Sequence, residues 1–461
     1  MKKNDFLGKN IVKQFVEWMS ARLDSETFRH GYVTRKRRRE WACDDLHGAF
    51  TGYDWPHRGV KRLGVPAGTS FESSAAALDA LRRDLQVALS PTPDDAAALA
   101  AACDVMRWGG VSNGNVSWLE ANADGLAKML IEVRDALDAG DTGHPTLVKA
   151  GLRFNAGMTK VYSLICKDFI IYDSRVAAAL GWAVVKFCRE RSLATVPAEL
   201  AFAWAPAKEA AGANSPKLRN PATDGYVFPG LGGGTAHAQA NLLASWLLAA
   251  VLDHPNVARS RFALVEDRAN RLRALEAALF MVGYDLGGTG AAVPVGAVAT
   301  VEDDEEWINC CTLAQGSEFK YKVDREGIAI RRTAIDRDGN AIRRAPLRFS
   351  DETIDGTLNW LYERFGASRF PLANSADAVP AGLAEDGLGV AYHAVTGGGN
   401  APDTSKLAAA LVDMSVISRV RVAGRAGTQL CFSANALDLV SRLGRFDFRK
   451  FIDEYGDDDE A

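Results

Sequence analysis

The apolar pattern of the chain changes at residues 287–303, and this change constrains the fold more than any other feature. Before it, apolar residues recur at helical spacing, whereas later segments such as residues 319–323 alternate between apolar and polar, as strands do. The stretch between begins with GGTG at 287–290 and is rich in Gly, Ala and Val, which is typical of a linker. The chain has 461 residues, and one hydrophobic core rarely organises more than roughly 250–300. We therefore predict a mainly α domain at 1–286, a linker at 287–303 and a smaller α+β domain at 304–461.

The first domain should consist almost entirely of helices. Residues 6–50 have apolar side chains at helical spacing and are expected to form a helical lead-in segment. Ser70 and the sequence TPDD at 92–95 are helix-start signals. The further helices that we predict span residues 70–89, 92–108, 115–139, 196–212, 235–253 and 258–284.

The C-terminal domain should mix strands and helices. The predicted elements are strands at 319–323 and 327–335, a hairpin turn at 336–340, helices at 351–365, 404–418 and 435–443, and a hairpin at 419–432. A helix followed by a hairpin is typical of a winged helix, and an α+β fold without that topology fits the pattern equally well. The domain ends in an acidic tail, because six of the last ten residues are Asp or Glu.

Composition excludes several classes of protein. Apolar residues make up 48% and charged residues 24%, and no apolar run approaches the roughly 18 residues of a membrane helix, so we predict no membrane partner. The first residues lack the apolar core of a secretory signal, and we expect a cytoplasmic protein. The seven cysteines are scattered and form no CxxC pair, so we predict reduced thiols, no metal site and no cofactor. The sequence does not indicate an oligomeric state.

The net charge of −4 hides a local excess of cations. Residues 1–62 hold 14 Lys and Arg against 8 Asp and Glu, and the excess is concentrated in one basic run that includes Arg35, Lys36 and Arg37. Such a run can bind DNA phosphates with release of counterions. It can equally be a solvated surface, and the sequence leaves both readings open.

Lys160 and Asp173 lie in the segment with the strongest functional signal. Asp173 falls between the apolar run FIIY and a long amphipathic helix, where an N-cap belongs, and the helix dipole there would keep its carboxylate ionised. Lys160 follows the turn made by Gly157 in the sequence FNAGMTKVYSLI. Each residue alone is most simply a cap or a solvated lysine. Together, an anion and an amine suit cleavage of an N-glycosidic bond, whose transition state places positive charge on the sugar.

At these residues the chain resembles the helix-hairpin-helix DNA glycosylase superfamily, in particular proteins with the 8-oxoguanine DNA glycosylase fold. GMTKV at 157–161 is similar to the hairpin step that carries the family's lysine, and DSRV at 173–176 to the step that carries its aspartate. The resemblance covers roughly residues 100–285 and includes RWGGV at 107–111. It implies that Lys160 is a nucleophile and Asp173 a stabilising carboxylate. The four-cysteine cluster loop of some relatives is absent.

A glycosylase must also hold an extruded base and the DNA backbone. Tyr226 and Phe228 lie in a Gly/Pro-rich loop at 220–234, which is a candidate lid over the base. The other candidates for base contacts are Trp108, Phe154, Asn155, Tyr172 and His237. The candidates for DNA backbone contacts, besides the basic run, are Lys149, Arg153 and Gly157.

We therefore expect a DNA glycosylase that acts on double-stranded DNA with a damaged or modified base, with or without a lyase step through Lys160. The added domain favours the hypothesis that the substrate is a modified base of invading phage DNA. The alternative is a non-enzymatic DNA-binding protein on the same scaffold. A nuclease or metal enzyme is disfavoured, because the sequence has neither HExxH nor a PD-(D/E)xK arrangement on clear strands.

Overall fold

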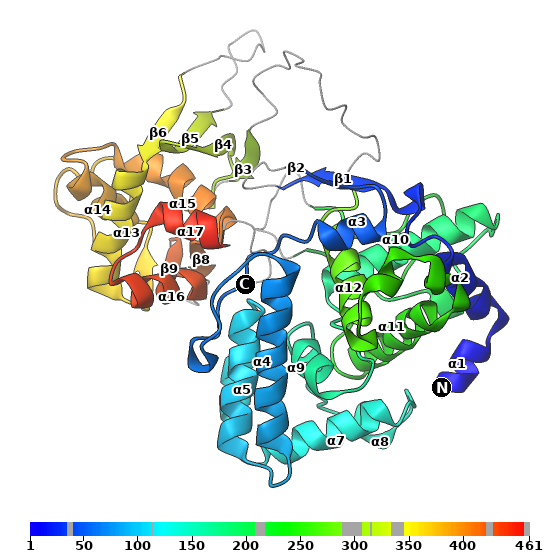
Figure 1. Cartoon of the computed structure of the whole chain (residues 1–461). Coiled ribbons are helices and arrows are strands. Elements are labelled where there is room, and N and C mark those ends of the chain that lie inside the picture. Colours follow the sequence, from blue (N-terminus) through cyan, green and yellow to red (C-terminus); the bar gives the residue numbers. More distant parts are fainter. Residues whose placement is uncertain are drawn as a thin grey trace.

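The computed structural model describes residues 1–34, 40–112, 114–207, 217–287, 307–313, 316–332, 345–420 and 427–455. Within these ranges the protein is mainly α-helical. Its buried apolar side chains form two clusters, one between Phe6 and Val282 and the other between Ile308 and Tyr455. Figure 1 shows the corresponding parts, with the first coloured blue to green and the second yellow to red.

The first part consists of twelve α-helices and one two-stranded hairpin among the described residues. Its helices are α1 (Lys3–Gly8), α2 (Asn10–Ser20), α3 (Leu46–Thr51), α4 (Phe71–Leu89), α5 (Asp95–Trp108), α6 (Asn115–Ala121), α7 (Leu126–Asp138), α8 (Pro145–Val148), α9 (Met158–Ile165), α10 (Ser174–Glu190), α11 (Thr235–Asp253) and α12 (Arg268–Val282). The starts of α4 and α5 confirm the cap signals, because the side chains of Ser70 and Asp94 accept hydrogen bonds from backbone N–H groups in the first turns.

The lead-in segment is not wholly helical, which corrects the prediction for residues 6–50. Strands β1 (His30–Val33) and β2 (Glu40–Cys43) form an antiparallel hairpin, with Tyr32 opposite Trp41. Alternate residues of β1 are buried, and the Tyr32 and Trp41 rings stack at 4.8 Å. Each strand is only four residues long, so its alternation of apolar and polar residues is too short to be distinguished in the sequence from the helical pattern on either side.

Three other predicted helices are shorter than expected. The segment 115–139 is divided into two helices, because α6 ends at Ala121 and α7 begins after Gly125, which adopts a left-handed φ of 78°. The predicted helix at 258–284 starts only at Arg268, where Asp267 caps α12. Within 196–212 the described residues contain a single 3₁₀ turn, Ala198–Leu200.

The helices form two groups that face each other across the centre of the first part (Figure 1). On one side, α4 and α5 pack together and against α9. On the other side, α10 and α12 pack together, with α2 and α11 behind them. Because α9 and α10 follow each other in the chain, the segment that joins them lies at the boundary between the groups.

The second part is α+β in content. Its elements are β3 (Ile308–Cys311), β4 (Glu318–Asp324), β5 (Gly327–Arg332), β6 (Leu347–Ser350), α13 (Asp351–Phe365), β7 (Phe370–Pro371), α14 (Leu388–Val395), α15 (Thr404–Asp413), β8 (Ile417–Val420), β9 (Gln429–Phe432), α16 (Ala434–Leu443) and α17 (Phe448–Tyr455). Strands β3 to β6 form an antiparallel sheet in chain order, and β7, β9 and β8 form a second antiparallel sheet in that order. A helix followed by a hairpin is present as α15, β8 and β9, while the winged-helix assignment remains a prediction.

Several sequence predictions fall outside the described residues. These are the basic run with Arg35, Lys36 and Arg37, most of the linker (288–303), the hairpin turn at 336–340 and the acidic tail from 456 onward. Asp453 and Glu454 belong to α17.

Candidate functional site

Helix α9 carries Lys160 in its first turn, and Asn155 fixes where that helix starts. The side-chain Oδ1 of Asn155 accepts hydrogen bonds from the backbone N–H groups of Gly157 and Met158, both at 2.9 Å. Gly157 itself has an ordinary φ of −76°, so its conformation does not require glycine. Glycine is required by space, because a Cβ there would lie 2.2 Å from Nδ2 of Asn115.

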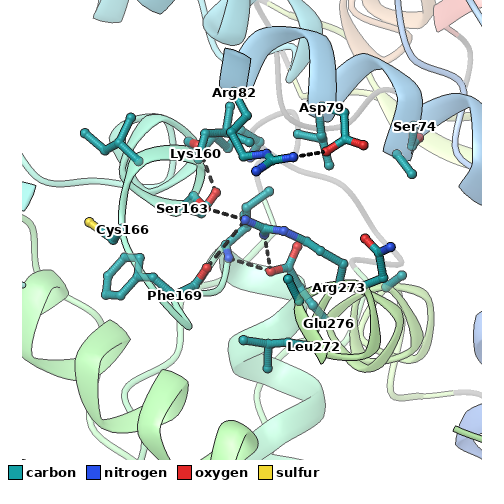
Figure 2. Close-up of a pocket in the computed structure, with 18 of the residues that line it drawn as sticks. Ser74, Asp79, Arg82, Lys160, Ser163, Cys166, Phe169, Leu272, Arg273 and Glu276 are labelled. Carbon is teal, nitrogen blue, oxygen red and sulfur yellow. Dashed lines mark hydrogen bonds and ion pairs between the residues drawn. The ribbon is translucent and has the colours of Figure 1, made fainter. Parts of the chain in front are cut away.

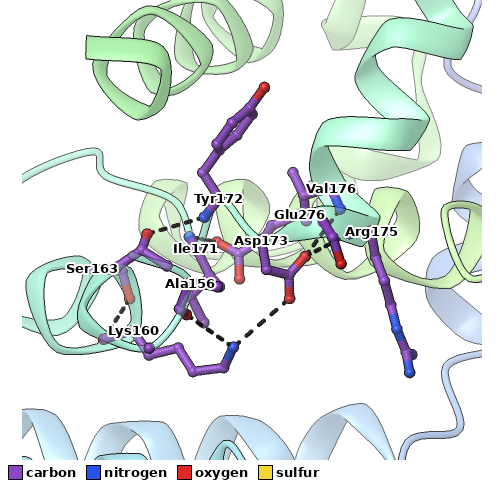
Figure 3. A network of polar contacts seen from close by, with 12 residues as sticks. Ala156, Lys160, Ser163, Ile171, Tyr172, Asp173, Arg175, Val176 and Glu276 are labelled. Atoms are coloured by element: carbon purple, nitrogen blue, oxygen red, sulfur yellow. Dashed lines mark hydrogen bonds and ion pairs between the residues drawn. The ribbon is translucent and has the colours of Figure 1, made fainter. Parts of the chain in front are cut away.

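Asp173 is the N-cap of α10, as its position in the sequence predicts. Its Oδ1 accepts hydrogen bonds from the backbone N–H groups of Arg175 (3.0 Å) and Val176 (3.1 Å). Its other oxygen, Oδ2, lies 3.8 Å from Nζ of Lys160. The cap therefore uses one carboxylate oxygen and directs the second toward the lysine (Figure 3).

The ion pair between Lys160 and Asp173 is almost completely shielded from solvent. The two side chains are 3% and 1% exposed, and Nζ of Lys160 also donates to the carbonyl oxygen of Ala156 at 3.3 Å. Removal of a charged pair from water is costly unless geometry and further hydrogen bonds compensate. A buried pair of opposite charges that also lines a cavity is a recurrent property of functional sites.

Thr159 connects the two segments that carry the pair. Its Oγ1 accepts a hydrogen bond from the backbone N–H of Tyr172 at 3.1 Å and donates to Oδ1 of Asn241 in α11. Asn241 in turn donates to the carbonyl oxygen of Ile170 at 3.0 Å. The neighbours of both charged residues are thereby held by the same buried network.

The WGG turn lies directly against the lysine. A Cβ at Gly109 would be 2.5 Å from Cδ of Lys160 and 2.7 Å from its Cε, so any larger residue would displace the side chain. The next residue, Gly110, has a φ of 65°, a left-handed conformation that favours glycine. The two glycines of this turn therefore have separate physical roles.

Lys160 and Asp173 line one cavity of about 790 Å³. Ligand pockets commonly measure roughly 300–1,000 Å³, so the space is sufficient for a nucleoside. Its walls come from α4, α9 and α12 together with the chain before α4 and the end of α7. Figure 2 shows its polar side, where Arg82 of α4 and Arg273 of α12 both extend toward α9.

One wall of the cavity is aromatic. Trp55 packs edge-on against Trp108 at 5.4 Å and against Phe280 at 5.8 Å, and Tyr53 lies 6.2 Å from Phe280. Phe71 completes the wall, with its ring 6.1 Å from that of Tyr53. Of these residues only Trp108 was predicted. The others were missed because they come from segments far from the lysine in sequence, and no local signal distinguishes them from core aromatics.

Arg273 and Glu276 brace the segment that leads to Asp173. Arg273 donates to Oε2 of Glu276 at 2.6 Å and to the carbonyl oxygen of Ser163 at 2.5 Å (Figure 2). The same Oε2 accepts from the backbone N–H of Ile171 at 2.7 Å. Burial raises the pKa of Glu276, the charge of Asp173 acts in the same direction, and Arg273 opposes both.

Most predicted base contacts lie away from the cavity. Among the described lining residues, Phe154, Asn155, Tyr172 and His237 are absent. The Phe154 ring is 1% exposed and stacks on Tyr162 at 4.8 Å. The Tyr172 hydroxyl donates to the carbonyl oxygen of Ala203 at 2.6 Å. These side chains therefore support the segment behind the ion pair.

His237 is a buried structural residue beside Lys160. Its Nε2 is 2.8 Å from the carbonyl oxygen of Tyr172 and donates to it as the neutral ring. Burial lowers the pKa of His237 to about 4, and the charge of Lys160 adds to the effect, while the bond to Tyr172 opposes it.

The Gly/Pro-rich loop does not cover the cavity. Tyr226 and Phe228 are 8% and 6% exposed, and the Tyr226 hydroxyl donates to the carbonyl oxygen of Leu193 at 2.8 Å. A Cβ at Gly181 of α10 would meet Pro221, so the loop packs against that helix. Among the described residues of the cavity wall none comes from 220–234, and the lid prediction is wrong for this conformation.

The predicted DNA backbone contacts have different surroundings. Lys149 is exposed, just after α8. Arg153 is turned toward α6, where it donates to Oδ1 of Asn115 at 2.9 Å and lies over the Trp118 ring at 5.5 Å. Gly157 is buried and packs against Asn115, so it is not on the surface where a DNA phosphate could bind. Of these three residues, Lys149 alone is an exposed cation.

Other cations line the cavity or the hollow beside it. Arg82 pairs with Asp79 at 3.0 Å, and both line the cavity. A second hollow of about 540 Å³ continues from the first and brings in Arg83. Arg83 and Lys167 are exposed, and in the described part of the chain the charge of Lys167 acts on the nearby carboxylate of Asp138. An exposed ion pair contributes little to stability, so Arg82 can exchange the carboxylate of Asp79 for a phosphate group.

Within the described ranges, no group of three or more His, Cys, Asp and Glu side chains is placed to hold a metal ion. Comparisons with protein-family models, curated proteins and solved structures found no match. The helices of the described residues are also too short or too polar to cross a membrane.

Proposed function

We propose that this protein is a DNA N-glycosylase that cleaves the bond between a modified base and its deoxyribose. One observation carries the proposal: the Lys160 and Asp173 side chains meet at 3.8 Å on the wall of a cavity that is large enough for a nucleoside. The similarity of both motifs to those of helix-hairpin-helix glycosylases supports the same conclusion.

The carboxylate of Asp173 would stabilise the sugar in the transition state. As the bond from C1′ to the base nitrogen breaks, the electron pair leaves with the base and C1′ becomes positively charged. Asp173 is held by two backbone N–H groups, so its charge needs no reorganisation as the reaction proceeds.

Two fates of C1′ are consistent with the geometry. In hydrolysis a water molecule attacks C1′, and its proton passes to the departing base. In the lyase route the Lys160 nitrogen, as the free amine, attacks C1′ in place of water. The C1′–O4′ bond then breaks, O4′ takes a proton from the attached nitrogen, and a protonated imine forms between the lysine and the opened sugar. Asp173, whose Oδ2 is 3.8 Å from Nζ, is the nearby carboxylate that could accept the proton that the ammonium must lose.

The remaining walls suit the other parts of an extruded nucleotide. A base everted from DNA is held by stacking and edge contacts, and the wall formed by Tyr53, Trp55 and Phe280 provides ring surfaces beside the ion pair. Lys167 on the wall of the cavity and Arg83 on the wall of the second hollow would hold phosphates.

The substrate is proposed to be a base of hypermodified phage DNA, in a role in defence. The size of the cavity supports this proposal, since about 790 Å³ exceeds the needs of an ordinary base. The cavity also has polar walls from Asp79, Arg82 and Asn270 that can contact a polar substituent.

A single set of reactions tests the function. The protein is incubated with duplexes that carry oxidised, mismatched or hypermodified bases, and abasic sites are counted with and without borohydride. Asp173→Asn should abolish excision of the substrate base. Lys160→Ala should abolish borohydride trapping in the lyase route, whereas excision that survives in this variant would indicate hydrolysis.

Matched variants separate chemistry from folding. Asp45 also caps a helix, α3, through a hydrogen bond from Gly48 at 2.7 Å, but it does not line the cavity, so Asp45→Asn should leave excision unchanged. Lys186 does not line the cavity either, so Lys186→Ala is the matched control for Lys160→Ala. Binding of DNA without excision of any base would instead identify a non-enzymatic DNA-binding protein.

A further inference from the structure

Arg58, in the chain before α4, reaches into the second part of the protein. Its guanidinium donates a hydrogen bond to Oδ1 of Asn435, lies 3.8 Å from Oδ2 of Asp438 and stands over the Tyr455 ring at 4.6 Å. The side chain is only 20% exposed. An arginine that is paired with a carboxylate and stacked on a ring in this way is well fixed, because its planar group satisfies both contacts at once.

The side chains that contact Arg58 are themselves held in place by hydrogen bonds. The Tyr455 hydroxyl of α17 donates to Asp438 of α16 at 2.9 Å, and Arg442 donates to the same carboxylate at 3.0 Å and to the Tyr455 hydroxyl at 2.7 Å. The ring and the carboxylate that receive Arg58 are therefore held together by a third side chain. The contact is formed by two helices of the C-terminal part rather than by a loop.

The segment around Arg58 is stiff enough to transmit this restraint. The backbone N–H of Trp55 donates to Thr69 at 3.0 Å and that of His57 to Gly68 at 2.8 Å, so the chain folds back on itself. The His57 ring is 3.0 Å from the hydroxyl of Ser73 at the start of α4. A Cβ at Gly59 would lie 2.4 Å from a backbone oxygen of the returning strand, which shows how closely the two runs approach.

The same segment forms the aromatic wall of the cavity. Trp55 precedes Arg58 by three residues and packs against Trp108 and Phe280. Trp108 is followed by Gly109, whose backbone lies against the stem of Lys160. A continuous series of contacts therefore leads from the C-terminal helices to the ion pair.

We propose that Arg58 is a positioning residue through which the C-terminal part fixes the aromatic wall of the candidate active site. The effect on base excision rests on the proposed function, whereas the effect on the wall does not. The C-terminal part is then a component of the substrate site and not only an attached module. Loss of the Arg58 contacts should loosen residues 53–58 and weaken binding of the base.

The test measures amide hydrogen exchange of Trp55 and His57 in the full-length protein, together with excision kinetics. In Arg58→Ala, and in Asp438→Asn from the opposite side, exchange at these two amides should rise about tenfold or more, because local opening becomes easier. Excision should show a raised KM and a kcat within about twofold of the parent, since the wall binds substrate and transition state alike. Arg58→Lys should restore part of the protection.

Arg364→Ala is the matched control. Arg364 also stacks on a ring, that of Trp360 at 3.5 Å, and pairs with Asp386 at 3.2 Å, but all three residues belong to the C-terminal part. Unchanged exchange in both Arg58→Ala and Asp438→Asn, or an equal rise in Arg364→Ala, overturns the inference. A parent protein that excises no base refutes the proposed function alone, because the exchange data still decide the role of Arg58.

Discussion

Gly109 provides the space in which the side chain of Lys160 lies. A Cβ at this position would approach Cδ of the lysine to 2.5 Å and Cε to 2.7 Å, and it would also contact the carbonyl oxygen of Val105 at 3.4 Å. The turn and the lysine are separated by about fifty residues in the chain, so their fit is a property of the fold.

Gly109→Ala should therefore displace the amine of Lys160. We expect a loss of stability of about 1–3 kcal/mol, which is typical of an overpacked core, and a fall in excision rate of about tenfold or more. Gly230→Ala, at an exposed glycine with open space around its would-be Cβ, should affect neither quantity. Urea unfolding and single-turnover excision measure the two effects, and normal excision in Gly109→Ala would contradict the prediction.

The ion pair predicts a strong coupling between Lys160 and Asp173. Asp173→Asn leaves an ammonium group at 3% exposure without its carboxylate, whereas Lys160→Met leaves a carboxylate that two backbone N–H groups still stabilise. The first variant should therefore lose more stability than the second. In a double-mutant cycle by urea unfolding we expect a coupling of about 1–3 kcal/mol, and additivity within about 0.5 kcal/mol would show that the pair contributes no interaction.

His237 predicts a specific acid sensitivity. Its pKa is about 4 in the folded protein and 6.5 ordinarily, so between these values only the unfolded chain takes up the proton. Stability is unaffected above pH 6.5 and is lost as the pH falls toward 4, by about 3 kcal/mol in total. His237→Gln keeps an N–H donor for Tyr172 but does not titrate. The parent should lose about this much more stability than the variant between pH 7.5 and 4, and parallel losses would exclude the assignment.

Arg83 and Lys167 allow a prediction of how DNA binding depends on salt concentration. If Arg83 and Lys167 each contact a phosphate, Arg83→Gln and Lys167→Gln should each reduce the slope of log K against log salt by about 1. Lys128 is also exposed but lies on α7 away from both hollows, so Lys128→Gln should leave the slope unchanged. Fluorescence anisotropy at several salt concentrations checks this, and equal slopes in all four proteins would place the DNA elsewhere.

Features that depend on neighbouring residues were predicted well from the sequence. The caps of α4, α5 and α10 were recognised because Ser70, Asp94 and Asp173 bond to N–H groups only two or three residues later. The proximity of Lys160 and Asp173 required the resemblance to a known family, since nothing in their spacing alone indicates that they meet.

Features that depend on distant contacts were not predicted. Trp55 and Phe280 share a wall although 225 residues separate them, and the packing of α3, which ends just before Trp55, against α12 brings them together. Tyr226 and Phe228 were assigned to a candidate lid over the base from their Gly/Pro-rich surroundings. A loop of that composition can still bury its aromatic rings, and here it does so against α10.

The hydrogen bonds of Thr159 have a consequence for how a ligand would enter. Because this hydroxyl joins the backbone before Asp173 to α11, the protein itself holds the lysine and the carboxylate at their separation. The entropic cost of ordering Lys160 and Asp173 is therefore met when the protein folds and not when a ligand binds. Such pre-organisation favours binding of the nucleotide without a change in the protein. Rearrangement on DNA binding would then be confined to the DNA strand, whose base must leave the helix.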